Sequence, residues 1–184
     1  AGKVDVTIDK ENSTITIKDN GLGMTEAEVE KYIAQLAFSG AQEFVDKMKD
    51  EGGEDKSDII GKFGLGFYSA FIVADKVEVH SLSMNEGSTP TKWICSGETE
   101  YTFESSDKKT VGTEIILHIN EESKEFLDSW KTRSTLSQYC DFMPYPIELI
   151  DLEGNKRIEQ ENAKAEKEED KKPIPSDIIN EVQP

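Results

Sequence analysis

GKFGLGFYSAFIVADKV, residues 61 to 77, is the stretch on which the interpretation of the whole chain depends. Gly61, Gly64 and Gly66 lie within six residues, directly before a mostly apolar run. In one interpretation the glycines form a tight turn before a buried helix, because glycine tolerates positive φ and close packing. In the other, their bare backbone N–H groups bind a phosphate at the N-terminus of a helix that begins near Phe67. For an isolated Gly-x-Gly the turn is favoured.

Two common nucleotide-binding motifs are absent from the sequence. It contains no GxxxxGK(S/T) segment, and the glycines over residues 61–66 are spaced GxxGxG rather than GxGxxG. The P-loop and the Rossmann dinucleotide site are therefore excluded as explanations of this glycine cluster.

The net charge of the chain is strongly negative. With 38 acidic and 21 basic residues among 184, the formal charge is -17, which argues against a nucleic acid or an anionic membrane as partner. A nucleotide could bind only where backbone donors or a metal ion offset that field locally. No apolar stretch approaches the length of a membrane span. Cys95 and Cys140 form no CxxC pair, which predicts a reduced, cytoplasmic protein.

Hydrophobic periodicity predicts an α+β fold. Residues 4–18 alternate as a β-hairpin, and Thr25 with Glu28 has the spacing of a capping box before a helix over 25–38. Four strand-like runs, a helix and a last strand follow, at residues 76–83, 91–97, 100–105, 112–119, 121–140 and 146–152. Turn residues separate most of the four runs, which predicts an antiparallel meander. We expect a two-layer sandwich, a largely antiparallel or mixed sheet with helices on one face.

The composition changes after residue 153. Residues 154–173 carry many charges and few residues that could be buried, which predicts a flexible linker. Apolar residues return over 174–184. The predicted organisation is a folded domain over 1–153, a charged flexible linker over 154–173 and the start of a truncated second domain over 174–184.

A second glycine cluster, DNGLGM, begins at Asp19. Asp19 could cap a turn formed by the residues that follow it. Alternatively, its carboxylate accepts a hydrogen bond from the exocyclic amine of adenine, Gly23 lets the ring approach the backbone, and Met24 offers a soft apolar surface. Thr113 is either a β-branched strand residue or a hydroxyl directed at the same base. Each signal alone is weak, but their order and context together favour a nucleotide site.

The order of these segments resembles that of the GHKL ATPases, and within them the heat-shock protein 90 chaperones. DNGLGM is similar to the DxGxGM segment of that family, residues 60–77 to its glycine-rich phosphate segment, and GTEIILHI to its Gly-Thr strand. The resemblance covers nearly the whole chain. Its most specific part is the run over 60–77, which histidine kinases, type II topoisomerases and MutL-type repair proteins do not share. It implies the GHKL (Bergerat) ATP-binding fold in a bacterial member of the family.

The resemblance also implies a set of site residues. These are Asp19, Gly23, Met24 and Thr113 around the adenine, and the backbone of Gly64, Leu65, Gly66 and Phe67 around the phosphates. Asp19 would bond the adenine amine, usually together with a bridging water. Thr113 would bond the same water or the ring. Residues 34–66 match the mobile lid of the family, although an ordinary flexible loop remains an open alternative.

The sequence also departs from the family pattern. The family's Glu that activates the attacking water, and its Asn that helps to hold magnesium, lie on a helix that precedes the segment where this sequence begins. Glu11 and Asn12 lie in the hairpin turn and do not replace them. No catalytic residue and no metal ligand is therefore predicted in this chain. Tyr32 and Phe38 stand where many relatives have a nucleotide-contacting Asn and Lys, so those contacts are not carried over.

The resemblance implies an ATP-dependent chaperone that binds ATP or ADP with magnesium and hydrolyses ATP in the intact protein. Such a protein would act as a homodimer on client proteins in the cytoplasm. Residues 1–153 would be its N-terminal ATP-binding domain, without the family's first strand and helices, and 174–184 the start of its middle domain. Two alternatives remain open: a fragment that binds nucleotide without catalysis, and another GHKL ATPase such as a histidine kinase or a MutL-like protein.

Overall fold

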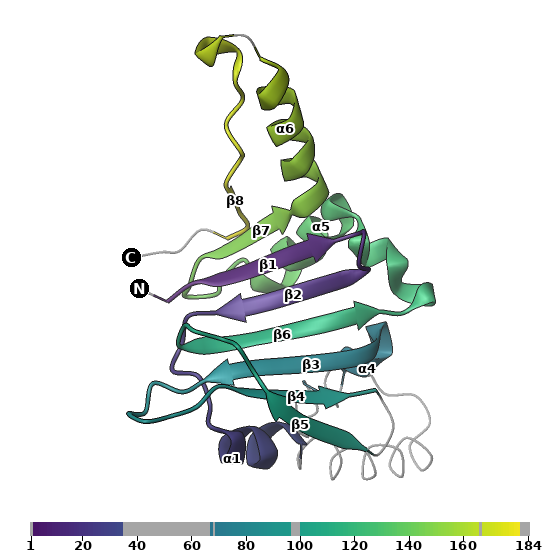
Figure 1. The fold of residues 1–184 in the computed structure, drawn as a ribbon. Helices are drawn as coiled ribbons and strands as arrows, with labels where there is room; N and C mark the ends of the chain where they lie inside the picture. The colour runs from purple at the N-terminus through teal and green to yellow at the C-terminus, as the bar shows by residue number, and fades with distance from the viewer. Residues whose placement is uncertain (1, 35–66, 68, 97–99, 166, 181–184) are drawn as a thin grey trace.

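An eight-stranded mixed sheet organises the part of the chain that the structure describes (Figure 1). The structure is a computed structural model, and the described residues are 2–34, 67, 69–96, 100–165 and 167–180. The strands are β1 Val4–Asp9, β2 Thr14–Asp19, β3 Ala74–Leu82, β4 Thr91–Cys95, β5 Tyr101–Ser105, β6 Gly112–Ile119, β7 Ile147–Asp151 and β8 Asp177–Ile178. Their order in the sheet is β5-β4-β3-β6-β2-β1-β7-β8. All neighbours run antiparallel except β1 and β7, which are parallel.

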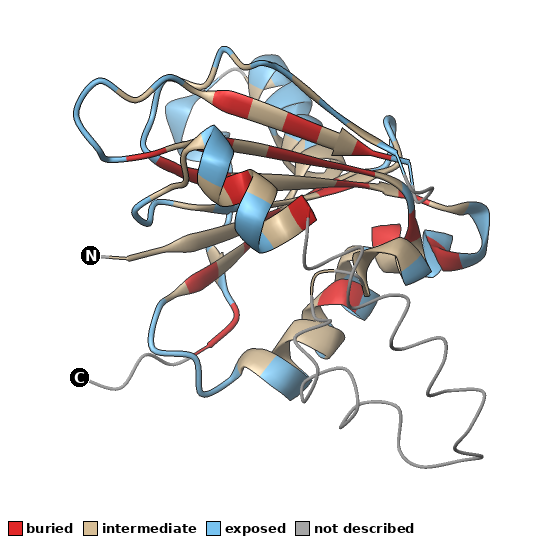
Figure 2. Ribbon diagram, turned by 90° about the horizontal axis from the view of Figure 1, so that it is seen from below, coloured by how far each residue is buried: buried red, intermediate tan, exposed pale blue. Residues whose placement is uncertain are grey.

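The helices give the structure its second layer. They are α1 Glu26–Val29, a π-helical turn Glu30–Ala34, α4 Ala70–Val73, a 3₁₀ helix Glu121–Leu127, α5 Ser129–Cys140, α6 Leu152–Lys164 and a 3₁₀ turn Glu168–Asp170. In Figures 1 and 2, α1, α4 and α5 lie on the same face of the sheet, whereas α6 extends away from the end of the sheet that holds β7 and β8. The predicted α+β architecture, a mixed sheet with helices, is confirmed.

The core lies between the sheet and its helices. Side chains alternate along each strand, so one set faces the helices. In β3 these are Val77 and Val79, and in β4 Trp93, all fully buried. Val29 of α1 is fully buried against the same core. The burial of apolar residues at every second strand position therefore fixes which face the helices cover.

The first elements form as the sequence predicts. The β1–β2 hairpin pairs Ile8 with Ile15, and its turn is closed by Asp9, which accepts hydrogen bonds from the backbone and side-chain nitrogens of Asn12 at 3.0 and 2.8 Å. Thr25 caps α1 with both halves of the capping box in place. The predicted helix is confirmed as far as Ala34, and its remaining residues lie outside the described ranges.

Two predictions about the later elements are wrong in detail. The four strands do not form a simple meander, because β6 pairs with β3 and β2 instead of β5. In this central position Leu117 and Ile119 are buried. The single helix expected over 121–140 is interrupted at Asp128, whose backbone is extended and whose side chain caps α5 by accepting from the Lys131 amide at 3.0 Å.

The prediction of a flexible segment from residue 154 onward is also wrong for the part that forms α6. Asp151 caps this helix by accepting from the Gly154 amide at 3.1 Å. No residue of α6 is buried, so favourable capping and helix propensity stabilise it without core packing. The division into a domain, a linker and a second domain stays a prediction.

The segment after α6 returns to the sheet. β8 pairs with β7, and Ile179 and Asn180 are buried at 7% and 4% exposure. The Asn180 side chain accepts from the Ile147 amide at 2.9 Å and donates to the carbonyl oxygens of Met143 and Tyr145, each at 2.9 Å. One amide side chain thus joins β8 to the loop that precedes β7.

We expect Asn180→Asp to release β8 from β7. The substitution keeps the acceptor but replaces two donated bonds with a buried charge facing two carbonyl oxygens, which is unfavourable. Hydrogen exchange of the Ile179 amide, which donates to Ile147 O at 2.8 Å, should become about tenfold faster or more. Asn162→Asp is the control, because Asn162 also bonds through both side-chain atoms but is not buried. Unchanged exchange in the Asn180 variant would contradict this role.

The other face of the sheet carries a buried carboxylate, Glu78 of β3, at 9% exposure. Its Oε1 accepts from Nε2 of His118 and from Nζ of Lys76, both at 3.0 Å. Its Oε2 accepts from Nε2 of His80 at 3.1 Å, with Nζ of Lys92 at 3.6 Å. Burial alone would raise the pKa of Glu78, but the hydrogen bonds from His80, Lys76 and His118 outweigh it and lower the pKa to about 2.

This network predicts a pH-dependent contribution to stability. The Glu78 carboxylate stabilises the fold above its ordinary pKa of 4.5 and loses that contribution, on the order of 2 kcal/mol, as the pH falls toward 2. Glu78→Gln should therefore lower the melting temperature strongly at neutral pH and progressively less below pH 4.5. Thermal unfolding followed by circular dichroism measures the difference.

The matched control is Glu104→Gln. Glu104 belongs to the same group of charges through Lys92, at 3.3 Å, but its side chain is 53% exposed. An exposed pair of this kind contributes little. A Glu78→Gln effect that stays constant between neutral and acidic pH would show that the carboxylate charge contributes nothing to stability.

Candidate functional site

The ends of β2 and β3 lie on either side of the start of β6. The register pairs Ser81 of β3 with Thr113, and Lys18 of β2 with Glu114. Thr113 therefore lies between Ser81 and Asp19, the last residue of β2. Its backbone amide donates to Oδ1 of Asp19 at 3.3 Å, although the two residues are 94 positions apart. The structure thus brings together two of the residues that the sequence analysis singled out, while their roles stay predictions.

Asp19 uses its two carboxylate oxygens differently. Oδ1 accepts from the Gly21 amide at 2.8 Å as well as from the Thr113 amide. Among the residues that the structure describes, no group donates to Oδ2. Asp19 is half-buried. The two interpretations of this residue are therefore compatible, because Oδ1 closes the turn while Oδ2 keeps its lone pairs for an outside donor such as an amine.

Two glycines allow the backbones around this site to approach closely. Gly23 has a φ of 64°, and a Cβ there would lie 1.9 Å from the carbonyl oxygen of Leu82. Gly112 has a φ of 123°, and a Cβ there would lie 2.3 Å from the carbonyl oxygen of Asp19. Any side chain at either position would push β3 or β2 away. Gly23 thus has a backbone role in addition to the adenine contact predicted for it.

Ser81 is the residue that the sequence analysis missed. It is fully buried, accepts from the Met24 amide at 2.8 Å, and shares a 2.9 Å hydrogen bond with the Thr113 hydroxyl. The sequence does contain a signal for it. Ser81 continues the alternation of Val77 and Val79, so it is a polar residue on the core-facing side, and such a residue requires hydrogen-bond partners.

The predicted phosphate segment is mostly outside the described residues. Gly64, Leu65 and Gly66 fall there, and so does the predicted lid apart from Ala34. Phe67 is described, and its ring packs edge-to-face on Trp93 with 5.7 Å between centroids. Its side chain therefore belongs to the core, which is compatible with a ligand role for its backbone alone. The helix expected from Phe67 is found as α4, beginning at Ala70.

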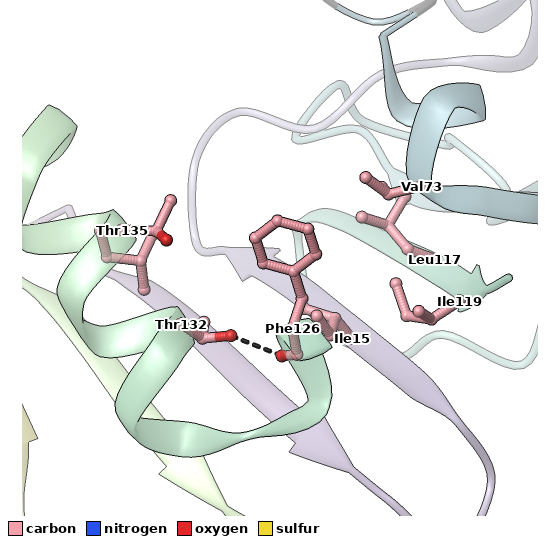
Figure 3. Close-up of a pocket in the computed structure, with 8 residues that line it drawn as sticks. Ile15, Val73, Leu117, Ile119, Phe126, Thr132 and Thr135 are labelled. Carbon is pink, nitrogen blue, oxygen red and sulfur yellow. Dashed lines mark hydrogen bonds between the residues drawn. The ribbon is translucent and has the colours of Figure 1, made fainter. Parts of the chain in front are cut away.

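An apolar pocket of about 170 Å³ lies between α5 and the sheet (Figure 3). Its lining residues are Ile15, Val73, Leu117, Ile119, Phe126, Thr132, Thr135 and Leu136. The hydroxyl of Thr132 donates to the carbonyl oxygen of Phe126, so it is not directed at a ligand. This lining offers no group that could bind a charged nucleotide, and the pocket is separate from Asp19 and Thr113.

Within the described ranges, His, Cys, Asp and Glu side chains form no group of three or more suited to a metal ion. The two histidines bind Glu78 instead. In the same part of the chain, no helix is both long and apolar enough to cross a membrane.

Comparison with known proteins identifies the family to which this chain belongs. Residues 1–132 match the family of histidine kinase-, DNA gyrase B- and HSP90-like ATPases. The match spans most of the chain, and the chain belongs to this family. The resemblance drawn from the two glycine clusters and the Gly-Thr strand is thereby confirmed.

The relatives found among curated proteins carry the name Chaperone protein HtpG. That of Porphyromonas gingivalis is 52% identical over 145 residues, which cover 79% of this chain and 21% of the relative. That of Bacteroides thetaiotaomicron is 42% identical over 183 residues, which cover 100% of this chain and 25% of the relative. That of Geobacter metallireducens is 44% identical over 147 residues, or 79% and 23%. The chain thus spans about a quarter of the length of these relatives.

The close backbone approach at Gly23 leads to a stability prediction. Gly23→Ala should destabilise the protein by on the order of 3 kcal/mol or more, because it adds a clash with the Leu82 carbonyl to the strain of a positive φ. Gly87→Ala isolates the strain, since Gly87 has a φ of 79° and nothing within 4 Å of an added Cβ. It should cost only about 1 kcal/mol. If Gly23→Ala and Gly87→Ala lower the melting temperature equally, the clash with the Leu82 carbonyl is relieved at no cost in stability.

Proposed function

We propose that this chain binds the adenine of ATP or ADP at the ends of β2 and β6. Asp19 would accept from the exocyclic amine through Oδ2, Gly23 and Met24 would lie against the ring, and the Thr113 hydroxyl would bond the same edge of the base or a water beside it. The observation that carries the proposal is the contact of Asp19 with Thr113, with one carboxylate oxygen occupied by backbone donors. Family membership supports the same ligand.

The phosphate end of the nucleotide is proposed from the sequence. The backbone amides of Gly64, Leu65, Gly66 and Phe67 would bind the phosphates, because missing side chains expose N–H groups in a glycine-rich segment. Magnesium would balance the phosphate charge in this acidic chain. No residue of this chain is proposed as its ligand or as the base that activates water.

For the intact protein we propose an ATP-dependent chaperone with ATPase activity. The relatives named as chaperones support this function, and their length leaves room for the further domains it requires. Closure of a lid within residues 34–66 would couple ATP binding to the chaperone cycle. The protein would act as a homodimer on client proteins in the cytoplasm.

Asp19→Asn tests the adenine site. An asparagine can keep Oδ1 as acceptor for the two backbone amides, so the fold should be retained. Its Nδ2 would replace Oδ2, however, and would place a donor against the adenine amine. We expect ADP affinity of the intact protein, measured by calorimetry, to fall by about 100-fold or more.

The control is Asp170→Asn, which makes the same charge change at an exposed position in the C-terminal segment. It should leave ADP affinity unchanged. If Asp19→Asn retains the affinity of the unmodified protein, the adenine is not bound by this carboxylate, and the proposed site is wrong.

A further inference from the structure

Ser81 lies at the junction of the three elements that form the adenine site. Its Oγ accepts from the Met24 amide at 2.8 Å, and it lies 2.9 Å from Oγ1 of Thr113 and 3.4 Å from the carbonyl oxygen of Gly112. The side chain is fully buried. A serine hydroxyl has one hydrogen and two lone pairs, and the Met24 amide occupies one of the lone pairs.

The distances indicate where the hydrogen of Ser81 points. An O–H···O hydrogen bond is normally no longer than about 3.0 Å, so the contact with Gly112 O at 3.4 Å is a poor one. If Thr113 donated to Ser81, the buried Ser81 hydrogen would have only that poor acceptor. If Ser81 donates to Thr113, its hydrogen has a good acceptor at 2.9 Å and only a lone pair stays unfilled. An unsatisfied acceptor is tolerated more readily than an unsatisfied donor, so the second arrangement is favoured.

We propose that Ser81 is a positioning residue that determines which nucleobase this site accepts. By donating to Oγ1 of Thr113, it leaves the Thr113 hydrogen free to be donated toward the ligand. Thr113 then presents a donor beside Asp19, which presents an acceptor through Oδ2. This inference rests on the proposed adenine site and adds the reason for its specificity.

The resulting pair matches adenine and mismatches guanine. On the edge that distinguishes these bases, adenine has an amine donor at N6 and an acceptor at N1, whereas guanine and hypoxanthine have an acceptor at O6 and a donor at N1. The acceptor at Asp19 and the donor available at Thr113 complement the adenine edge. In guanine and hypoxanthine both positions are reversed, so O6 would face the Asp19 carboxylate and the N1 hydrogen would face the Thr113 hydrogen. This mismatch is worth about 1–3 kcal/mol, or roughly 5- to 150-fold in affinity.

The test compares ADP with inosine diphosphate. In inosine diphosphate, O6 and N1–H replace the N6 amine and the N1 acceptor of ADP, and the two molecules are otherwise identical. Calorimetry on the intact protein gives the affinity ratio of the two ligands. Ser81→Ala removes the hydrogen bond that orients the Thr113 hydroxyl, so the ratio should fall about tenfold. Ser81→Thr keeps a hydroxyl at this position and should retain the ratio. Ser83→Ala, a neighbouring buried serine whose hydroxyl bonds the Asn85 amide, should also retain it.

The outcomes separate this inference from the function on which it rests. If the unmodified protein does not bind ADP, the proposed function fails. If it binds ADP and Ser81→Ala weakens both ligands equally, Ser81 has a structural role only and the inference is overturned.

A second measurement needs no variant and decides the matter if Ser81→Ala does not fold. In 1-deaza-ADP a C–H replaces the N1 acceptor, so the unmodified protein should bind it about tenfold more weakly than ADP. Equal binding of these two ligands would show that Thr113 donates nothing to N1, and would overturn the inference.

Discussion

The insertion of β6 between β2 and β3 is the constraint on which the rest of the structure depends. It places Thr113 beside Asp19 on one neighbour and beside Ser81 on the other. It is possible only because Gly112 has no side chain, since a Cβ there would meet the carbonyl oxygen of Asp19. The same strand position also buries Leu117 and Ile119 in the core. The burial of Leu117 and Ile119 and the meeting of Asp19, Ser81 and Thr113 are therefore consequences of the position of one strand.

Much of the fold follows from local sequence signals, because those signals act over a few residues. The alternation in the first hairpin, the Thr25–Glu28 capping box and the strand patterns after residue 74 all specify structure without reference to distant segments. The site residues Asp19 and Thr113 were predicted for a different reason. Their spacing in the chain carries no geometric information, and only the order of several motifs, matched to a family, indicated that they would meet.

The features that sequence reasoning missed depend on tertiary competition. The strand pattern of β6 is the same whether it pairs with β5 or lies between β2 and β3, so the pattern does not specify its neighbours. At Asp128, continuation of the preceding helix competes with the capping of a new one. α6 forms in a segment with the composition of a linker, and Asp151 as its cap was the local signal available. Ser81 could have been inferred only from its position on the core-facing side of β3.

Hydrogen bonding distinguishes two carboxylates of this acidic chain, Glu78 of β3 and Asp19 of β2. Glu78 has donors on both oxygens, from two histidines and a lysine, and the result is a low pKa. Asp19 has both of its backbone donors on Oδ1. A carboxylate bonded through both oxygens stabilises the fold, whereas one bonded through a single oxygen, as Asp19 is among the described residues, can still accept a hydrogen bond through the other. Charge and burial alone would rank Glu78 as the more unusual group, yet Asp19, which has no donor to Oδ2 among the described residues, is the carboxylate for which we propose a ligand.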